Sequence, residues 1–106
     1  MTSNQAADGI AAASVRLDEL LVAAKPAEAA ALFTEDAVLG ESGMADVVGR
    51  AAIQAFLERG DQVRRVTHHL LHRDELVMIS PDRAIEFGWF DETKVPIGGE
   101  PIMERG

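Results

Sequence analysis

The sequence predicts an α+β domain in which helices come first and antiparallel strands follow. Up to Gly60, the apolar residues recur at the three-to-four-residue spacing of a helix. From Val63 onward they come in short runs rich in Val, Ile, Phe and Trp, which is typical of strands. The length of 106 residues suffices for one hydrophobic core and is too short for two, so a single domain over residues 1–106 is expected.

Three helices are predicted before the strands. The first spans Ile10 to Lys25, where no Gly or Pro interrupts the pattern. Pro26 stops it and suits the first turn of a second, alanine-rich helix from Ala27 to Phe33. The third runs from Arg50 to Arg59, and Gly60 is expected to end it because glycine adopts the left-handed cap conformation without steric cost.

Strands are predicted at five places in the chain. They are the short segment Asp36–Leu39, the runs Val63–His72, Glu75–Ser80 and Ala84–Glu92, and the beginning of a strand at Ile102–Arg105. A turn at Ser80–Arg83 has Pro81 at its second position, as type I turns prefer. Residues 40–48 are expected to form a loop. Both faces of Ala84–Glu92 carry bulky residues, so one face is expected on the helices and the other on a second copy of the chain.

The composition excludes several classes of protein. The absence of cysteine rules out disulfides, thiolate catalysis and cysteine-bound metals. A net charge of −8 argues against binding to nucleic acid, because phosphate contacts need clustered Lys and Arg. No apolar run approaches the roughly 20 residues that a membrane span requires. Residues 1–8 are polar, are expected to be disordered and do not resemble a signal peptide, so a cytoplasmic location is expected.

Two segments resemble the nuclear-transport-factor-two-like superfamily, in particular its ketosteroid-isomerase and SnoaL-like polyketide-cyclase branches. The first is ALFTEDAVLGE, residues 31–41, which closes one helix and opens a strand. The second is VVGRAAIQAFLERG, residues 47–60, and a turn before RAIEF completes the same layout. The resemblance covers roughly Leu17 to Glu92. It identifies the fold better than the function, because this fold hosts many chemistries.

The resemblance implies a cone-shaped pocket between the helices and a curved sheet, with a small apolar molecule as its ligand and a homodimer as the assembly. We expect the pocket to be lined by apolar side chains from the helices and strands: Leu17, Leu20, Leu21, Phe33, Leu39, Phe56 and Trp89. Relatives usually end in two long strands. This chain stops at Gly106, so the given sequence is expected to lack its natural end.

Glu41 is the first candidate for catalysis. The resemblance places it where the isomerases hold the carboxylate that shuttles a proton. A carboxylate that faces an apolar cavity loses hydration and becomes a stronger base. The alternative is a solvated loop residue, because Glu41 is followed by Ser42 and Gly43. The isomerases also use a tyrosine from the first helix, but this chain has no tyrosine and carries Leu17 at that position.

The three histidines form the second candidate group. On a strand, His68 and His72 point to one side and His69 to the other. Some dehydratases and cyclases of the superfamily hold a histidine on a strand that lines the pocket, and a neutral imidazole is a competent acid–base group near pH 7. The alternatives are a histidine in the dimer interface, or a metal site at His68 and His72, for which the sequence offers no third ligand.

Two functions follow from these residues. The first is a cofactor-free, metal-free enzyme of isomerase, lyase, cyclase or epoxide-hydrolase type. It would use Glu41 as base and His68 or His69 as partner on a small apolar molecule. The second is a non-catalytic dimeric module that binds a hydrophobic ligand or only associates. Convergence of Glu41 and a histidine in one closed cavity would favour the enzyme.

Overall fold

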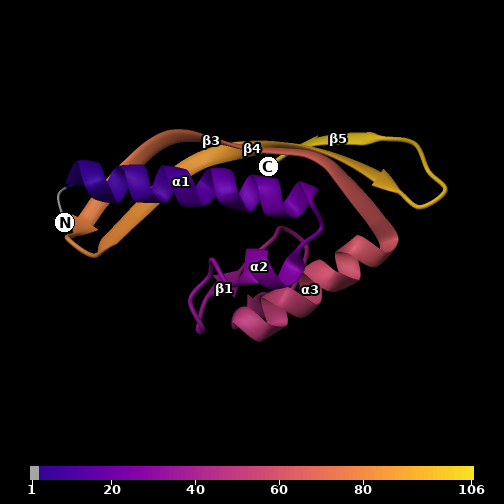
Figure 1. Ribbon diagram of the computed structural model, residues 1–106, viewed down its shortest axis with the longest axis horizontal. Helices are drawn as coiled ribbons and strands as arrows, with labels where there is room; N and C mark the ends of the chain where they lie inside the picture. Colours follow the sequence, from indigo (N-terminus) through magenta and orange to yellow (C-terminus); the bar gives the residue numbers. More distant parts are fainter. Residues whose placement is uncertain (1–2) are drawn as a thin grey trace.

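The computed structural model describes residues 3–106 and has the predicted α+β order (Figure 1). Three helices precede the main sheet: α1 (Ser3–Val22), α2 (Pro26–Ala30) and α3 (Arg50–Val63). The main antiparallel sheet has the order β3 (Arg64–Ser80), β4 (Arg83–Pro96), β5 (Ile102–Arg105). A small antiparallel pair, β1 (Val38–Leu39) and β2 (Val47–Val48), joins α2 to α3. The predicted fold class is confirmed.

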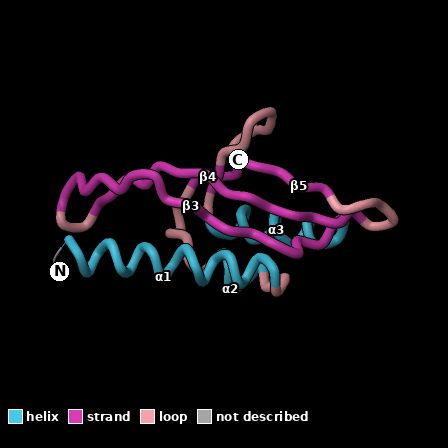
Figure 2. Tube along the Cα trace, turned by 90° about the horizontal axis from the view of Figure 1, so that it is seen from above, coloured by secondary structure: helices cyan, strands magenta, loops and turns pink. Residues whose placement is uncertain are grey.

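The helices cover one face of the curved three-stranded sheet. In Figure 1 all three helices lie on the same side of β3 and β4. Seen from above, the three strands lie side by side and α1 runs along β3 (Figure 2). We call the face toward the helices the inner face and the opposite one the outer face. The curvature has a local cause, since β3 contains three register irregularities opposite a continuous β4, and each bends the strand.

The core lies where the three helices meet the first part of β3. Its fully or nearly buried apolar residues are Leu20, Ala29, Ala30, Ile53 and Val66. Because the buried side chains of α2 are the small methyl groups of Ala29 and Ala30, this helix can pack closely against the neighbouring helices. The side chain of Arg50 ties α3 to the segment after α2, because its Nε and Nη2 donate to the Phe33 carbonyl at 2.8 and 2.6 Å.

Several helix boundaries differ from the sequence prediction, and α1 and α2 each end three residues earlier than predicted, at Val22 and Ala30. Helix α1 already includes Ser3 to Gly9, where disorder is predicted over residues 1–8, and residues 1 and 2 lie outside the described part. Helix α3 continues through Gly60 to Val63. Gly60 does not cap this helix. A Cβ at this position would collide with the guanidinium of Arg64, so the glycine makes room for that side chain.

The strands are longer than predicted. The break predicted at Arg73–Asp74 is a bulge inside one continuous strand, β3. A bulge adds a residue to one strand without ending the pairing, and a propensity pattern cannot distinguish it from a turn. The loop predicted over 40–48 contains β2, whose two valines pair with β1. The turn after Ser80 and the strand at Ile102–Arg105 are confirmed.

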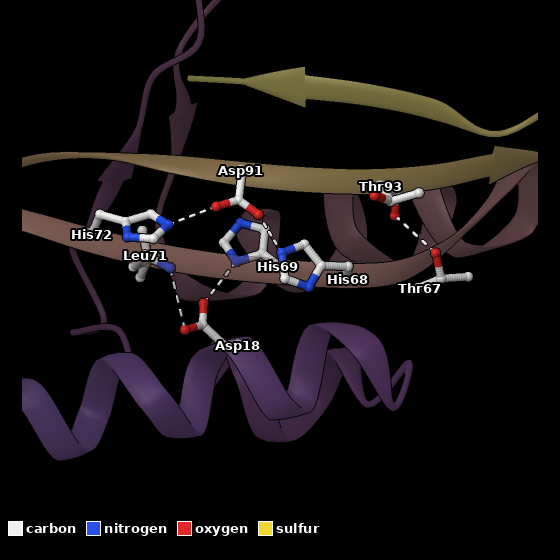
Figure 3. Close-up of polar contacts among 8 residues, drawn as sticks. All are labelled: Asp18, Thr67, His68, His69, Leu71, His72, Asp91 and Thr93. Carbon is white, nitrogen blue, oxygen red and sulfur yellow. Dashed lines mark hydrogen bonds and ion pairs between the residues drawn. The ribbon is translucent and has the colours of Figure 1, made fainter.

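Two histidines share one carboxylate on the outer face. The Nε2 atom of His68 binds Oδ1 of Asp91, and Nε2 of His72 lies 2.6 Å from Oδ2 (Figure 3). The His72 ring stacks on Trp89 with 3.9 Å between centroids, and the Arg105 guanidinium lies 4.3 Å from the centre of the same indole. These contacts join β3, β4 and β5. The hydrogen bond from His72, followed by that from His68, lowers the pKa of Asp91 below its ordinary value of 3.8.

This shift predicts a dependence of stability on pH. Because the pKa of Asp91 is lower in the folded state, its carboxylate stabilises the fold above about pH 3.8 and loses that contribution as the pH falls through the lowered value. We expect Asp91→Asn to lower the Tm between pH 5 and 7, and the difference from the unaltered protein to vanish in stronger acid. The difference in Tm is measured by thermal unfolding, followed by circular dichroism, at pH values from 2.5 to 7.

The matched control is Glu104→Gln, which removes a carboxylate with one ion-pair partner, Lys94, on the same sheet, whereas Asp91 has two histidine partners. A single surface pair contributes little to stability, so this variant should change the Tm less than Asp91→Asn does. A Tm difference for Asp91→Asn that stays constant down to the most acidic sample would contradict the role assigned to the carboxylate.

Candidate functional site

A mostly apolar cavity of about 220 Å³ lies between the helices and the inner face of β3 and β4. Its walls come from α1, α2, α3, β1, β3 and β4. Six of the seven residues predicted for the pocket line it: Leu17, Leu20, Leu21, Phe33, Leu39 and Phe56. These six side chains meet at one cavity, and their role in binding an apolar ligand stays a prediction.

Trp89 is the exception, because it lies on the outer face against His72 and does not line the cavity. In the β3–β4 ladder Trp89 pairs with His72, and the next residue, Phe90, pairs with Leu71. Phe90 and Leu71 both line the cavity. The alternation of side chains along β4 predicts from the sequence that Trp89 and Phe90 lie on opposite faces of the sheet. It does not predict which of the two faces the helices.

His69 is the histidine that faces the cavity. Its Nδ1 atom lies 2.7 Å from Oδ1 of Asp18, which comes from α1 (Figure 3). The second oxygen of Asp18 accepts the backbone N–H of Leu71 at 3.3 Å. The side chains of His69 and Asp18 are only 9% and 11% exposed. The His69 ring also stacks on Phe90 with 5.0 Å between centroids, so two contacts fix its orientation.

This arrangement favours one tautomer of the neutral His69 ring. An ionised carboxylate only accepts hydrogen bonds, so Nδ1 of His69 carries the hydrogen that it donates to Asp18. In the neutral ring Nε2 then holds the free electron pair. A ring held in this way can accept a proton at Nε2, and the nearby carboxylate stabilises the imidazolium that forms.

Asp18 is a site residue that the sequence analysis does not identify. Its signal is an acidic residue within the apolar pattern of the first helix, three residues from Val15 and from Leu21. Acids are rarely buried unless they are paired, so such a position indicates a polar partner on the facing element. Periodicity alone does not show that this partner is His69, 51 residues further along the chain.

The other two predicted catalytic residues lie elsewhere. Glu41 follows β1, lines the cavity and is at the same time exposed to solvent, which places it at the rim. His68 is on the outer face, bound to Asp91. The catalytic roles of both stay predictions. The pairing of His68 and His72 on one carboxylate is not accompanied by a metal site, since residues 3–106 hold no group of three or more His, Asp or Glu able to bind a metal ion.

The end of the cavity away from His69 is formed where α3 passes directly into β3. It contains Asp61 and Arg64, and Lys25 and Glu92 also line the cavity. Burial raises the pKa of Asp61 although much of the residue meets solvent, and the positive charge of Arg64 partly opposes that rise. The Nε atom of Arg64 is buried and has no hydrogen-bond partner within the described structure.

None of the helices in the described part of the chain is long and apolar enough to cross a membrane.

Three solved structures share this fold. A ketosteroid isomerase-like protein from Erwinia carotovora atroseptica aligns with 91% of this chain and 74% of its own length, at 20% identity and a TM-score of 0.77. A protein from Catenulispora acidiphila in complex with S-DNPA aligns with 98% of this chain and 75% of its own, at 18% identity and a TM-score of 0.73. A second structure from Catenulispora acidiphila aligns with 99% and 76%, at 20% identity and a TM-score of 0.71.

No curated protein matches the sequence. Residues 5–86, however, match the family of the SnoaL-like domain, and that match extends from α1 to the first residues of β4. It contains both Asp18 and His69, and it agrees with the arrangement of helices and curved sheet described above. The chain therefore belongs to the SnoaL-like domain family.

Proposed function

We propose that the protein is an isomerase or lyase that removes a proton from carbon in a small apolar molecule, with His69 as the general base. One observation carries this proposal: the imidazole of His69 lines an apolar cavity while the buried carboxylate of Asp18 holds its Nδ1. The pair also joins α1 to β3, but that structural role does not require the imidazole to lie at the wall of a cavity. Perturbed or precisely paired groups in a cleft are a recurrent mark of catalytic sites.

The proposed reaction has two steps. Nε2 of His69 takes a proton from a carbon whose C–H bond is acidified by a neighbouring carbonyl, and the electron pair moves onto the carbonyl oxygen. The imidazolium, stabilised by Asp18, then returns the proton to a different carbon in an isomerase or gives it to a departing group in a lyase. The apolar walls exclude water, which strengthens the electrostatic effect of Asp18.

The family and the neighbours support this class of reaction. Both branches that the chain resembles act on small molecules, and one structural neighbour is described as ketosteroid isomerase-like. This chain differs in its candidate base. Glu41 is at the solvent-exposed rim, whereas His69 is nearly buried and has an orienting partner. Our proposal therefore moves the principal role from Glu41 to His69.

Proton abstraction can be tested without the natural substrate. We expect the protein to catalyse exchange of the C1 hydrogens of 2-tetralone, a bicyclic ketone, for deuterium in D₂O, as followed by proton NMR. His69→Gln and Asp18→Asn should each lower the exchange rate by about 10²–10⁴-fold, because they remove the base or its correct tautomer. Circular dichroism establishes whether each variant is folded.

His72→Gln is the matched control. It removes a histidine that is also bound to a carboxylate and stacked on an aromatic ring, but on the outer face. We expect it to keep the exchange rate of the unaltered protein. Full activity of folded His69→Gln would remove His69 from the role of base. No catalysed exchange of 2-tetralone and of the smaller ketone 3-cyclohexenone by the unaltered protein would favour the non-catalytic binding module.

Glu41→Gln separates the two candidate bases. Because Glu41 lies at the exposed rim, we expect this variant to keep the exchange rate within about tenfold, well short of the loss typical when a general base is removed. The same NMR measurement on 2-tetralone checks it. A loss as large as that of His69→Gln would return the role of base to Glu41.

We also propose that two copies associate through the outer face. On β4, the side chains of Ile85 and Phe87 belong to the same alternation as Trp89, and they are 44% and 53% exposed. Stable interfaces bury on the order of 1,600 Å² in total, which a sheet face can provide. Light scattering at micromolar concentration should give the mass of a dimer, and Phe87→Asp should give a folded monomer. A monomer without the substitution would contradict the proposal.

A further inference from the structure

We propose that two associated copies of the chain separate as the pH falls from about 7.5 to about 5.5, because His68 and His72 gain positive charge on the face through which the copies meet. The inference rests on the proposed association through the outer face and adds the condition that controls it. The partner is a second copy of this chain. The groups that respond to pH are the two histidines bound to Asp91.

The first observation is the position of these groups within the outer face. Trp89 and Asp91 are alternate residues of β4, and Arg105 of β5 pairs with Asp91, so their side chains share one face of the sheet. Ile85 and Phe87, the exposed apolar residues proposed for the interface, belong to the same alternation. A second copy that covers the apolar residues therefore also approaches the histidines.

The second observation is that the cluster is open to solvent in the single chain. The side chains of His68, His72 and Asp91 are 50%, 34% and 35% exposed. Protons therefore reach both rings while the copies are apart, whereas an interface would close the rings off from water. Removing a charged group from water is unfavourable unless an opposite charge compensates for it.

The third observation is the balance of charge around the two rings. Asp91 contributes one negative charge, and Arg105, whose guanidinium lies over the indole stacked on His72, contributes one positive charge. These charges cancel while both rings are neutral. Histidine is the side chain that ordinarily gains its charge between pH 5 and 8. Protonation of both rings therefore leaves two positive charges without compensation.

Other charged groups of the sheet do not cancel this added charge. Arg65 and Glu75 lie on the outer face on either side of the histidines, since their partners on β4 belong to the outer alternation, and their charges are opposite. The nearby carboxylates of Glu92 and Glu104 belong to the inner face, because Glu92 lines the cavity and Glu104 pairs with it. The outer face thus becomes more positive when the histidines take up protons.

Association of identical faces doubles the effect. When a face meets the same face of a second copy, a charge gained by one copy is also gained by the other. Like charges brought together across an interface are unfavourable. The dimer therefore binds fewer protons than the separate chains, and association weakens as the pH falls. The overall charge of −8 acts in the opposite direction, because its reduction in acid lessens the general repulsion between copies.

The test is sedimentation equilibrium of the full chain at about pH 7.5 and about pH 5.5, which gives the Kd of the dimer under each condition. We expect the Kd to rise by about 10- to 100-fold at the lower pH, since each proton that the dimer excludes changes it by about tenfold over this range. Circular dichroism at both pH values establishes that the protein and each variant are folded.

The double variant with His68→Gln and His72→Gln keeps a hydrogen-bond donor at each position but cannot take up a proton. Its Kd should change by less than about threefold between the two pH values. His68→Gln alone keeps the stacking of His72 on Trp89 and should show a smaller change than the unaltered protein. His69→Gln is the matched control, because it removes the third histidine of the chain, on the inner face, and it should keep the full change.

The outcomes separate this inference from the proposed association. A dimer with the same Kd at both pH values, or a folded double variant that keeps the full change, would show the inference to be wrong and leave the dimer in place. A protein that is monomeric at micromolar concentration and neutral pH would overturn both. The exchange of 2-tetralone tests the proposed enzyme independently, since His68 and His72 do not line the cavity.

Discussion

The contact between Asp18 and His69 is the interaction on which the arrangement of the site depends. It joins α1 to β3 across 51 residues of sequence, and the same carboxylate also holds a backbone N–H of β3. Both partners are largely withdrawn from water, where an unpaired carboxylate or imidazole would be unfavourable. The pair therefore fixes the position of the helix relative to the sheet, and the apolar cavity is the space enclosed when the helix is held there. The same two residues therefore contribute to the stability of the fold and to the shape of the cavity.

The sheet presents two different chemical surfaces because its side chains alternate. Its inner face carries His69 among apolar side chains, and its outer face carries His68 and His72 on one carboxylate beside an indole. Each face thus contains histidine bound to aspartate and stacked on an aromatic ring. Their surroundings differ. The inner pair is nearly closed off from solvent, whereas the outer cluster is substantially exposed, so similar residues meet a closed cavity in one place and join exposed strands in the other.

Sequence reasoning reached the fold and most of the cavity because both depend on local patterns. The helical spacing of Leu17, Leu20 and Leu21 identifies one wall, and the change of period after Gly60 identifies the sheet. It did not reach Asp18, whose partner His69 lies on another element. It also misplaced Trp89, because alternation defines two faces without orienting them. Bulges in β3 add a further difficulty, since they change which residues share a face without leaving a clear mark in composition.

The passage from α3 to β3 occurs between neighbouring residues, Val63 and Arg64, with no loop between them. Insertions and deletions are normally tolerated in loops, but this junction has none to absorb them. Since the side chains of a strand alternate, one residue added or removed here would turn the beginning of the strand over. One added residue would bring His68 to the inward position of His69, and one removed residue would bring Leu70 there, so the histidine that pairs with Asp18 would lose its place. The length of the chain at this junction is thus as much a part of the site as the identity of its residues.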